Sequence, residues 1–195
     1  MITRFWWVRH GPTHAKTAVG HLDLPADLSD TAALARLAAY LPEPAVIVSS
    51  DLQRASATAD AIQGNRTRLP HSPTLREMDF GDWDGVPFDQ VAKRDPELSR
   101  AFWDTPGDVA PPNGESWNEL SARIQTRTTE LAAEHAGKDI VIVAHFAVIL
   151  SALQNASNIA ATSAMRFKVD NLSVTQLEYL HSADSWRVIG VNHTP

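Results

Sequence analysis

The sequence predicts an α/β fold, a three-layer αβα sandwich with a mainly parallel central sheet. Short apolar, β-branched runs alternate with longer segments that have helical composition and spacing, a pattern typical of parallel sheets covered by helices. The 195 residues fit one domain, because a domain commonly holds roughly 100–200 residues. No internal repeat or linker interrupts the pattern, so we expect residues 1–195 to form a single domain.

The first part of the chain contains three predicted strands and two predicted helices. Gly and Pro end the first strand, and prolines end the first helix. Short polar side chains accept hydrogen bonds at helix starts, so we expect Ser29 or Asp30 to cap the first helix and residues 49–51 to cap the second. The predicted strands are residues 2–8, 45–48 and 67–69, and the predicted helices are residues 31–41 and a segment that ends near Gln63.

The second part begins with a stretch rich in Pro, Gly, Asp and Trp, which we expect to form a lid-like insertion around residues 75–115. Two short helices are predicted within it, at residues 88–94 and 96–103. Beyond it the pattern predicts helices at residues 117–135 and 147–155, and strands at residues 140–144, 167–169, 173–179 and 186–191. A hairpin between two of the last strands fits this pattern.

Composition excludes several classes of function. The net charge of −6 argues against a nucleic-acid binder, and the absence of cysteine excludes disulfides, thiolate catalysis and cysteine-ligated metals. The apolar stretch at residues 140–153 is too short and too polar to cross a bilayer, and the first residues show no signal-peptide pattern. We therefore expect a cytoplasmic protein that binds neither nucleic acid nor membrane.

Two histidines and two arginines follow predicted strands. Arg9 and His10 come directly after the first strand, and His145 comes after the strand at residues 140–144. Arg54 lies in the first turn of the helix that follows the second strand. Ligands of open α/β sheets bind outside the carboxyl ends of the strands, so we expect these four side chains to meet at one sheet edge.

This set of side chains suits phosphoryl transfer. An imidazole nitrogen is a good nucleophile near neutral pH, and guanidinium groups bind phosphate oxygens in a bidentate manner. A second histidine, if protonated, and a helix N-terminus add further positive charge. A proton donor for the leaving oxygen is also needed. The residues alone do not choose among the acidic candidates Glu77, Asp79, Asp82 and Asp84.

Less specific interpretations also exist. Arg-His-Gly alone is compatible with a surface turn, and a histidine after a buried strand is often structural. The spacing of His10, His14 and His21 would suit a metal on a helix, but Gly11 and Pro12 interrupt any helix there. We therefore expect no metal site and no cofactor.

The sequence contains five motifs in an order and spacing typical of one family: Arg9-His10-Gly11-Pro12-Thr13, Ser50-Asp51-Leu52-Gln53-Arg54-Ala55 with Thr58-Ala59, residues 75–85, Gly114-Glu115-Ser116 and Val141-Ile142-Val143-Ala144-His145. On these motifs the chain resembles the histidine phosphatase (phosphoglycerate mutase-like) superfamily over nearly its whole length. Within the family it looks closest to alpha-ribazole phosphatases of cobalamin biosynthesis, on the segments 80–83, 112–115 and 167–170 and on Trp103.

The resemblance implies a phosphoglycerate mutase-like fold and a role for each catalytic residue. His10 would be the phosphorylated nucleophile, and Glu77 would be the general acid and then the base for water. Arg9, Arg54 and His145 would complete the phosphate pocket. We group three further residues with the substrate-binding set, namely Thr13, Lys16 and Phe146.

Two members of that set depart from the family pattern. Lys16 stands where the family often has Asn, and Phe146 stands where it often has Gly. Lys16 is either a point charge for the phosphate or a solvated lysine. Phe146 narrows the pocket, stacks on a ring or simply packs.

The expected function is hydrolysis of a small metabolite's phosphomonoester through phosphohistidine, with alpha-ribazole 5'-phosphate as a candidate substrate. A mutase that moves phosphate within one small acid, and a non-catalytic phospholigand-binding protein on the same scaffold, are the alternatives. The expected partner is a small phosphorylated metabolite, and the chain is a monomer or homodimer. Aromatic residues of the insertion could stack on a flat base, although we expect at least two of Trp83, Trp103 and Trp117 to fill a core instead.

Overall fold

A computed structural model describes all residues, 1–195, and its centre is one six-stranded sheet. The strand order is β3-β2-β4-β1-β5-β6; the pairings β3–β2, β2–β4 and β4–β1 are parallel, and the pairings β1–β5 and β5–β6 are antiparallel. The strands are β1 (Ile2–Arg9), β2 (Val46–Ser49), β3 (Thr67–Arg68), β4 (Asp139–Ala144), β5 (Val174–Leu180) and β6 (Ser185–His193). The sheet is therefore mainly parallel, and β5 and β6 form the predicted hairpin.

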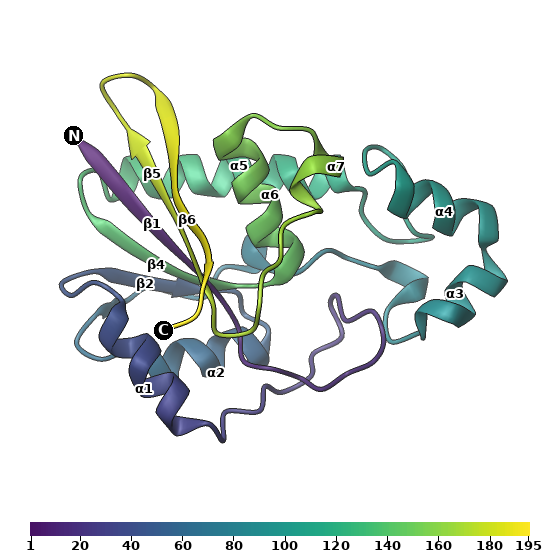
Figure 1. Ribbon diagram of the computed structural model, residues 1–195, viewed down its shortest axis with the longest axis horizontal. Coiled ribbons are helices and arrows are strands. Elements are labelled where there is room, and N and C mark those ends of the chain that lie inside the picture. Colours follow the sequence, from purple (N-terminus) through teal and green to yellow (C-terminus); the bar gives the residue numbers. More distant parts are fainter.

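Helices cover both faces of the sheet, which confirms the predicted three-layer architecture (Figure 1). One face packs against α5 and α6, and the other against α1 and α2. The side chains of β4 alternate between the two cores: Ile142 joins the first and Val143 the second. The helices are α1 (Thr31–Tyr40), α2 (Gln53–Ile62), α3 (Phe88–Arg94), α4 (Pro96–Asp104), α5 (Trp117–Glu134), α6 (Phe146–Ser157) and α7 (Ala161–Ala164).

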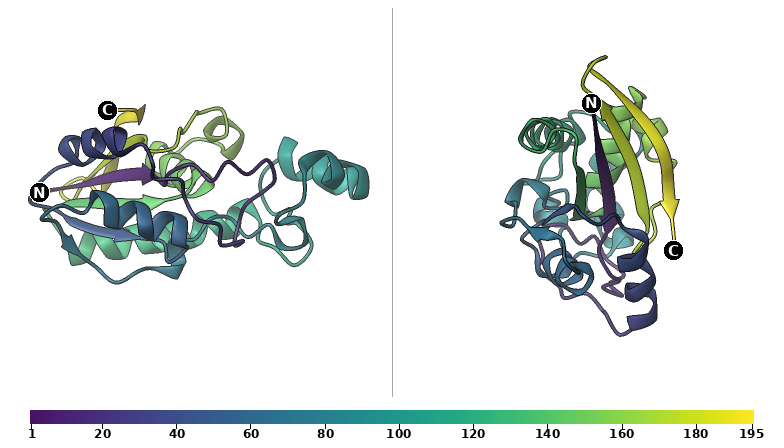
Figure 2. Two further views of the ribbon diagram at one scale, coloured as in Figure 1. Left: turned by 90° about the horizontal axis from the view of Figure 1, so that it is seen from below. Right: turned by 90° about the vertical axis from the view of Figure 1, so that its left-hand side faces the viewer.

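The helices α3 and α4 extend away from the sandwich, past the carboxyl ends of the strands (Figures 1 and 2). Two short 3₁₀ turns, Pro73–Leu75 and Gly81–Trp83, lead into them. None of the helices combines the length and apolar character needed to cross a bilayer.

Two predicted helix starts have different outcomes. Asp30 caps α1 by accepting a hydrogen bond from the Ala33 N–H, as expected. The expected side-chain cap of α2 is wrong, because that helix begins at Gln53 and has no side-chain cap. The carboxylate of Asp51 instead accepts two hydrogen bonds from Arg76, at 2.8 and 2.6 Å.

The predicted strand at residues 167–169 is also wrong. This segment follows the short helix α7, which the sequence analysis missed, and it pairs with no strand. Of its three residues only Val169 is buried, at 2% exposed, whereas Phe167 is 40% exposed. The Val169 carbonyl accepts a hydrogen bond from Arg9 at 2.7 Å instead of one from a neighbouring strand.

Candidate active site

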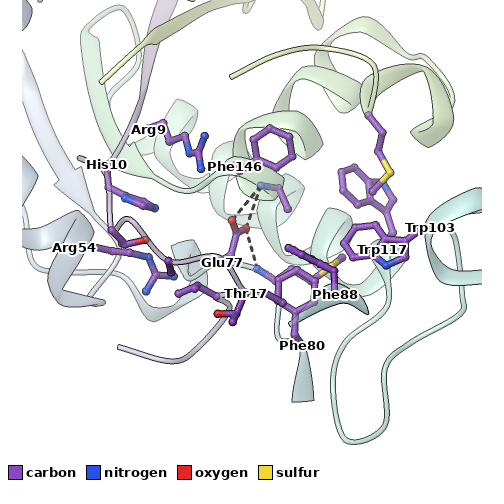
Figure 3. Close-up of a pocket in the computed structure, with 17 residues that line it drawn as sticks. Arg9, His10, Thr17, Arg54, Glu77, Phe80, Phe88, Trp103, Trp117 and Phe146 are labelled. Atoms are coloured by element: carbon purple, nitrogen blue, oxygen red, sulfur yellow. Dashed lines mark hydrogen bonds between the residues drawn. The ribbon is translucent and has the colours of Figure 1, made fainter. Parts of the chain in front are cut away.

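The sheet topology brings the predicted site residues together. The strands β1, β4 and β2 are neighbours, and all three are parallel, so their carboxyl ends meet at one edge. Arg9 ends β1 and His10 follows it, while His145 lies between β4 and α6. Arg54 points to the same place from the first turn of α2, and Glu77 comes from the segment between the two 3₁₀ turns (Figure 3).

The ring of His10 is held in one tautomer. Its Nδ1 lies 2.6 Å from the carbonyl oxygen of Gly11, and because a carbonyl only accepts, Nδ1 carries the hydrogen. The lone pair of the neutral ring is therefore on Nε2. Burial, opposed by the Gly11 hydrogen bond and assisted by the nearby arginines, lowers the pKa of His10 to about 3. At neutral pH His10 is an uncharged imidazole with a nucleophilic Nε2.

His145 lies beside His10, with ring centroids 5.0 Å apart. The side chain is fully buried, and neither ring nitrogen has a hydrogen-bond partner within the protein. Burial is the main cause that lowers the pKa of His145, and His10 and Arg54 act in the same direction. The protonated donor considered in the sequence analysis is therefore a neutral imidazole in this structure. It can still donate one N–H to a phosphate oxygen.

The two arginines are fixed by backbone carbonyls rather than by carboxylates. Arg54 is 1% exposed and donates to the carbonyls of Gly20 and Leu22, at 2.7 and 2.9 Å. Arg9 donates to the Val169 carbonyl, and its Nε is buried without a partner. Because neither arginine forms a salt bridge with a carboxylate, both guanidinium groups remain available to an anion.

Glu77 faces the same cavity and is 7% exposed. Its carboxyl oxygens accept hydrogen bonds from the N–H groups of Met78, at 3.0 Å, and Ala147, at 3.1 and 3.3 Å. Burial raises the pKa of Glu77, and this effect outweighs the opposing influence of the N–H donors and the arginines. The structure thus stabilises the protonated acid, which is the form that can donate a proton.

A family model named "Histidine phosphatase superfamily (branch 1)" matches residues 5–194. The chain belongs to this superfamily. The three-layer fold and the cluster of two histidines and two arginines agree with that membership. The superfamily's phosphatases are also among the chain's relatives and structural neighbours.

Three similar proteins illustrate the range of these relatives. A bifunctional protein of Mycobacterium tuberculosis, Rv2228c, is 32% identical over 147 residues, which is 74% of this chain but only 40% of that protein. An adenosylcobalamin/alpha-ribazole phosphatase of Salmonella typhimurium is 31% identical over 86% of each chain. The native structure of the mycobacterial glucosyl-3-phosphoglycerate phosphatase Rv2419c superposes with a TM-score of 0.86 at 26% identity, covering 99% of this chain and 100% of that one.

In this member of the superfamily, a cavity of about 540 Å³ is lined by the two arginines together with His10 and Glu77, and its wall is mostly apolar. Phe80, Phe88 and Trp103 pack against one another, with Trp103 6.2 Å from Phe80 and 6.1 Å from Phe88 between ring centroids. Figure 3 shows these rings on the side of the cavity away from Arg9 and His10. The lining residues are Arg9, His10, Thr13, Ala15, Thr17, Ala18, Val19, Arg54, Glu77, Met78, Phe80, Phe88, Trp103, Trp117, Phe146, Ala147 and Met165.

The tryptophans divide as expected. Trp83 and Trp117 are each 1% exposed and belong to the core, although Trp117 also forms part of the cavity wall. Trp103 is 39% exposed and lines the cavity, so it is the tryptophan whose surface a ligand could contact.

The remaining predicted residues lie at different depths. Thr13 and Phe146 line the cavity, and the guanidinium carbon of Arg9 lies 5.3 Å from the centroid of the Phe146 ring. Phe146 therefore forms a cation–π contact with Arg9. Lys16 is exposed and lies outside the lining set, although Ala15 and Thr17 on either side belong to it.

The spacing of His10, His14 and His21 was considered above for a metal site, but His14 and His21 each contact other groups. His14 is exposed and contacts Asp27 at 2.8 Å, and His21 contacts the Glu77 carbonyl at 3.1 Å. Since His10 bonds Gly11, the three rings do not converge on one point.

Sequence reasoning missed the residues that support the site. Arg123 of α5 donates to the Glu77 carbonyl at 3.0 Å and forms a bidentate pair with Glu115, at 2.6 and 3.0 Å. Thr58 accepts a hydrogen bond from the Gly11 N–H at 3.0 Å and donates to the Arg54 carbonyl at 2.7 Å. Glu115 and Thr58 both lie in the motifs that carried the resemblance, but their partners become evident only in three dimensions.

Proposed function

We propose that the protein hydrolyses small phosphomonoesters through a phosphohistidine at His10. The observation that carries the proposal is one cavity that holds an uncharged imidazole with its lone pair on Nε2, a buried carboxyl that favours its protonated form, and two guanidinium groups that have no salt-bridge partner. These are the nucleophile, the acid and the charge stabilisation that phosphoryl transfer requires.

In the first step, Arg9, Arg54 and His145 hold the phosphate oxygens, and Nε2 of His10 attacks the phosphorus atom. A P–N bond forms while the P–O bond to the leaving group breaks. Glu77 transfers its proton to the leaving oxygen, so the alcohol departs neutral and Glu77 becomes a carboxylate.

In the second step, the Glu77 carboxylate takes a proton from water as the water oxygen attacks phosphorus. The P–N bond breaks, inorganic phosphate forms, and both His10 and Glu77 return to their starting states. Because water replaces the proton that Glu77 gives to the alcohol, the cycle balances with the phosphate ester and water as its only reactants.

The cavity wall supports a substrate with an apolar or planar alcohol portion. Phe80, Phe88 and Trp103 provide a surface on which a flat base can stack. We therefore propose alpha-ribazole 5'-phosphate as the first substrate to test, supported by the 31% identity to the Salmonella phosphatase. Thr13 would contact the phosphate from the wall, Lys16 would attract it from the rim, and α3 and α4 would act as the lid.

The test is hydrolysis of an aryl phosphate and of a panel of phosphorylated metabolites by the purified protein and by His10→Ala. We expect turnover by the unaltered protein, a covalent phosphoryl group on His10 after rapid quenching, and loss of both in the variant. His14→Ala is the matched control, since His14 is exposed and contacts Asp27 rather than the cavity. Retained hydrolysis by His10→Ala would overturn the assignment.

The same panel separates the alternatives. Interconversion of 3-phosphoglycerate without phosphate release would favour a mutase. Affinity for phosphorylated ligands without turnover would favour a binding protein.

A further inference from the structure

Asp84 lies at the start of the extension that carries α3 and α4, and its carboxylate accepts hydrogen bonds from a loop of the active site. Its Oδ1 accepts a hydrogen bond from the Gly20 N–H at 2.8 Å, and its Oδ2 accepts one from the Leu22 N–H at 2.7 Å. Both carboxylate oxygens are thus used on one three-residue segment, residues 20–22.

The same two residues hold Arg54. The carbonyl oxygens of Gly20 and Leu22 accept from Nη2 and Nη1 of Arg54, at 2.7 and 2.9 Å. Each end of the segment therefore donates its N–H to Asp84 and offers its C=O to Arg54. The guanidinium group makes no other hydrogen bond within the protein, so this segment alone fixes its donors.

The segment has little freedom to adjust. A Cβ atom at Gly20 would lie 2.3 Å from the Met78 carbonyl oxygen, so the loop packs directly against the segment that bears Glu77. A neighbouring bond, from the Gly85 N–H to the Ala18 carbonyl at 2.8 Å, ties the loop to the same turn as Asp84.

We propose that Asp84 is a positioning residue for phosphate binding, which sets the Arg54 guanidinium through the Gly20 and Leu22 peptide groups. This inference rests on the proposed function in that it takes Arg54 as a phosphate ligand. It adds that hydrogen bonds through residues 20–22 connect the start of the helical extension, at Asp84, to the phosphate site, at Arg54. An arginine displaced by a fraction of an ångström loses bidentate geometry, and misplacement of about 1 Å is costly for a reacting group.

The test is Asp84→Asn, compared with Asp82→Asn as the matched control. Asp82 stands two residues earlier, and its carboxylate accepts from Asn113 rather than from the loop. An asparagine retains one acceptor oxygen but presents an NH₂ group to the other N–H, so it cannot hold both ends of the segment.

The primary readout is the Kd for inorganic phosphate by calorimetry, which needs no turnover. We expect Asp84→Asn to weaken phosphate binding and raise KM by about tenfold, with kcat changed by less than about threefold, because Arg54 holds phosphate before and during reaction. Asp82→Asn should bind phosphate like the unaltered protein. Asp84→Glu keeps the charge and should show an intermediate loss, and it serves if Asp84→Asn does not fold.

A double-mutant cycle separates positioning from general structural support. In an Arg54→Lys background the lysine cannot donate to the carbonyls of both Gly20 and Leu22 in the way that Arg54 does. Asp84→Asn should therefore cause little further loss of phosphate affinity. The same tenfold loss in that background, or unchanged affinity in Asp84→Asn itself, would overturn the inference while leaving hydrolysis intact. An Asp84-dependent phosphate site in a protein that hydrolyses nothing would instead retain the inference and refute the proposed function.

Discussion

The imidazole rings of His10 and His145 lie with their centroids 5.0 Å apart, and neither ring contacts a carboxylate. Two protonated imidazoles at this distance, beside Arg9 and Arg54, would repel one another in a site with little water. The pKa of each histidine is lowered, chiefly by burial. The site therefore keeps both rings neutral, and the arginines alone supply its positive charge.

This neutrality predicts a pH-dependent stability. The unfolded chain binds a proton on His10 near pH 6.5, whereas the folded protein does so only near pH 3. The stabilisation is therefore complete above pH 6.5 and is lost as the pH falls, by up to about 1.4 kcal/mol per pH unit for this group. Urea unfolding at pH 8.0, 6.0 and 5.0 should show a smaller acid loss in His10→Ala than in the unaltered protein. Parallel losses in the two proteins would contradict the lowered pKa of His10.

The acid role of Glu77 predicts a dependence on the leaving group. Glu77→Gln keeps the shape of the side chain but removes the transferable proton, so kcat/KM should fall by about 10²–10⁴ for an alkyl phosphate. An aryl phosphate with a nitro-substituted leaving group needs little protonation and should lose much less. Steady-state kinetics on both substrates measure the difference, and Asp82→Asn is the control. Equal losses on both substrates would refute the assignment.

Much of the candidate site could be predicted from strand ends alone. His10, Arg54 and His145 follow three short buried strands, and adjacent parallel strands place their carboxyl ends together, as the sheet confirms. Glu77 could not be chosen this way, because it lies in irregular structure among several acidic residues. Its distinguishing properties, burial and two N–H donors from separate segments, depend on tertiary packing.

The errors have related causes. Residues 167–169 match a short strand locally, but tertiary packing uses the Val169 carbonyl to hold Arg9. Similarly, Asp51 has the composition of a helix cap, but its carboxylate is occupied by Arg76. In both places a contact with an arginine that is distant in the sequence overrides the local structural preference. The local sequence pattern contains no information about that distant arginine.

Arg123 should act on the reaction through Glu77. Arg123→Gln removes the donor to the Glu77 carbonyl and leaves the partly buried Glu115 without its bidentate partner. We expect the free energy of unfolding to fall by about 1–3 kcal/mol. The kcat for an alkyl phosphate should fall by about tenfold, since the acid is less firmly placed. Arg127→Gln, one turn along the same helix, is the control, because Arg127 contacts Glu130 instead. A loss of stability with unchanged kcat would make the contact purely structural.

Phe146 should set the affinity for phosphate and for an aryl leaving group together. Its ring lies 5.3 Å from the guanidinium carbon of Arg9 and forms part of the cavity wall. Phe146→Ala removes both contacts, so KM for an aryl phosphate should rise by about threefold to thirtyfold, given roughly 0.5–2 kcal/mol for a cation–π contact. Phe146→Leu keeps an apolar wall without the π face, so its KM should lie between that of the unaltered protein and that of Phe146→Ala. Phe167→Ala is the control, because Phe167 is similarly exposed, at 40% against 36%, but does not line the cavity. If Phe146→Leu matches Phe146→Ala for the aryl phosphate, while KM for an alkyl phosphate is unchanged in both, the ring acts on affinity through the leaving group and its contact with Arg9 contributes nothing to phosphate binding.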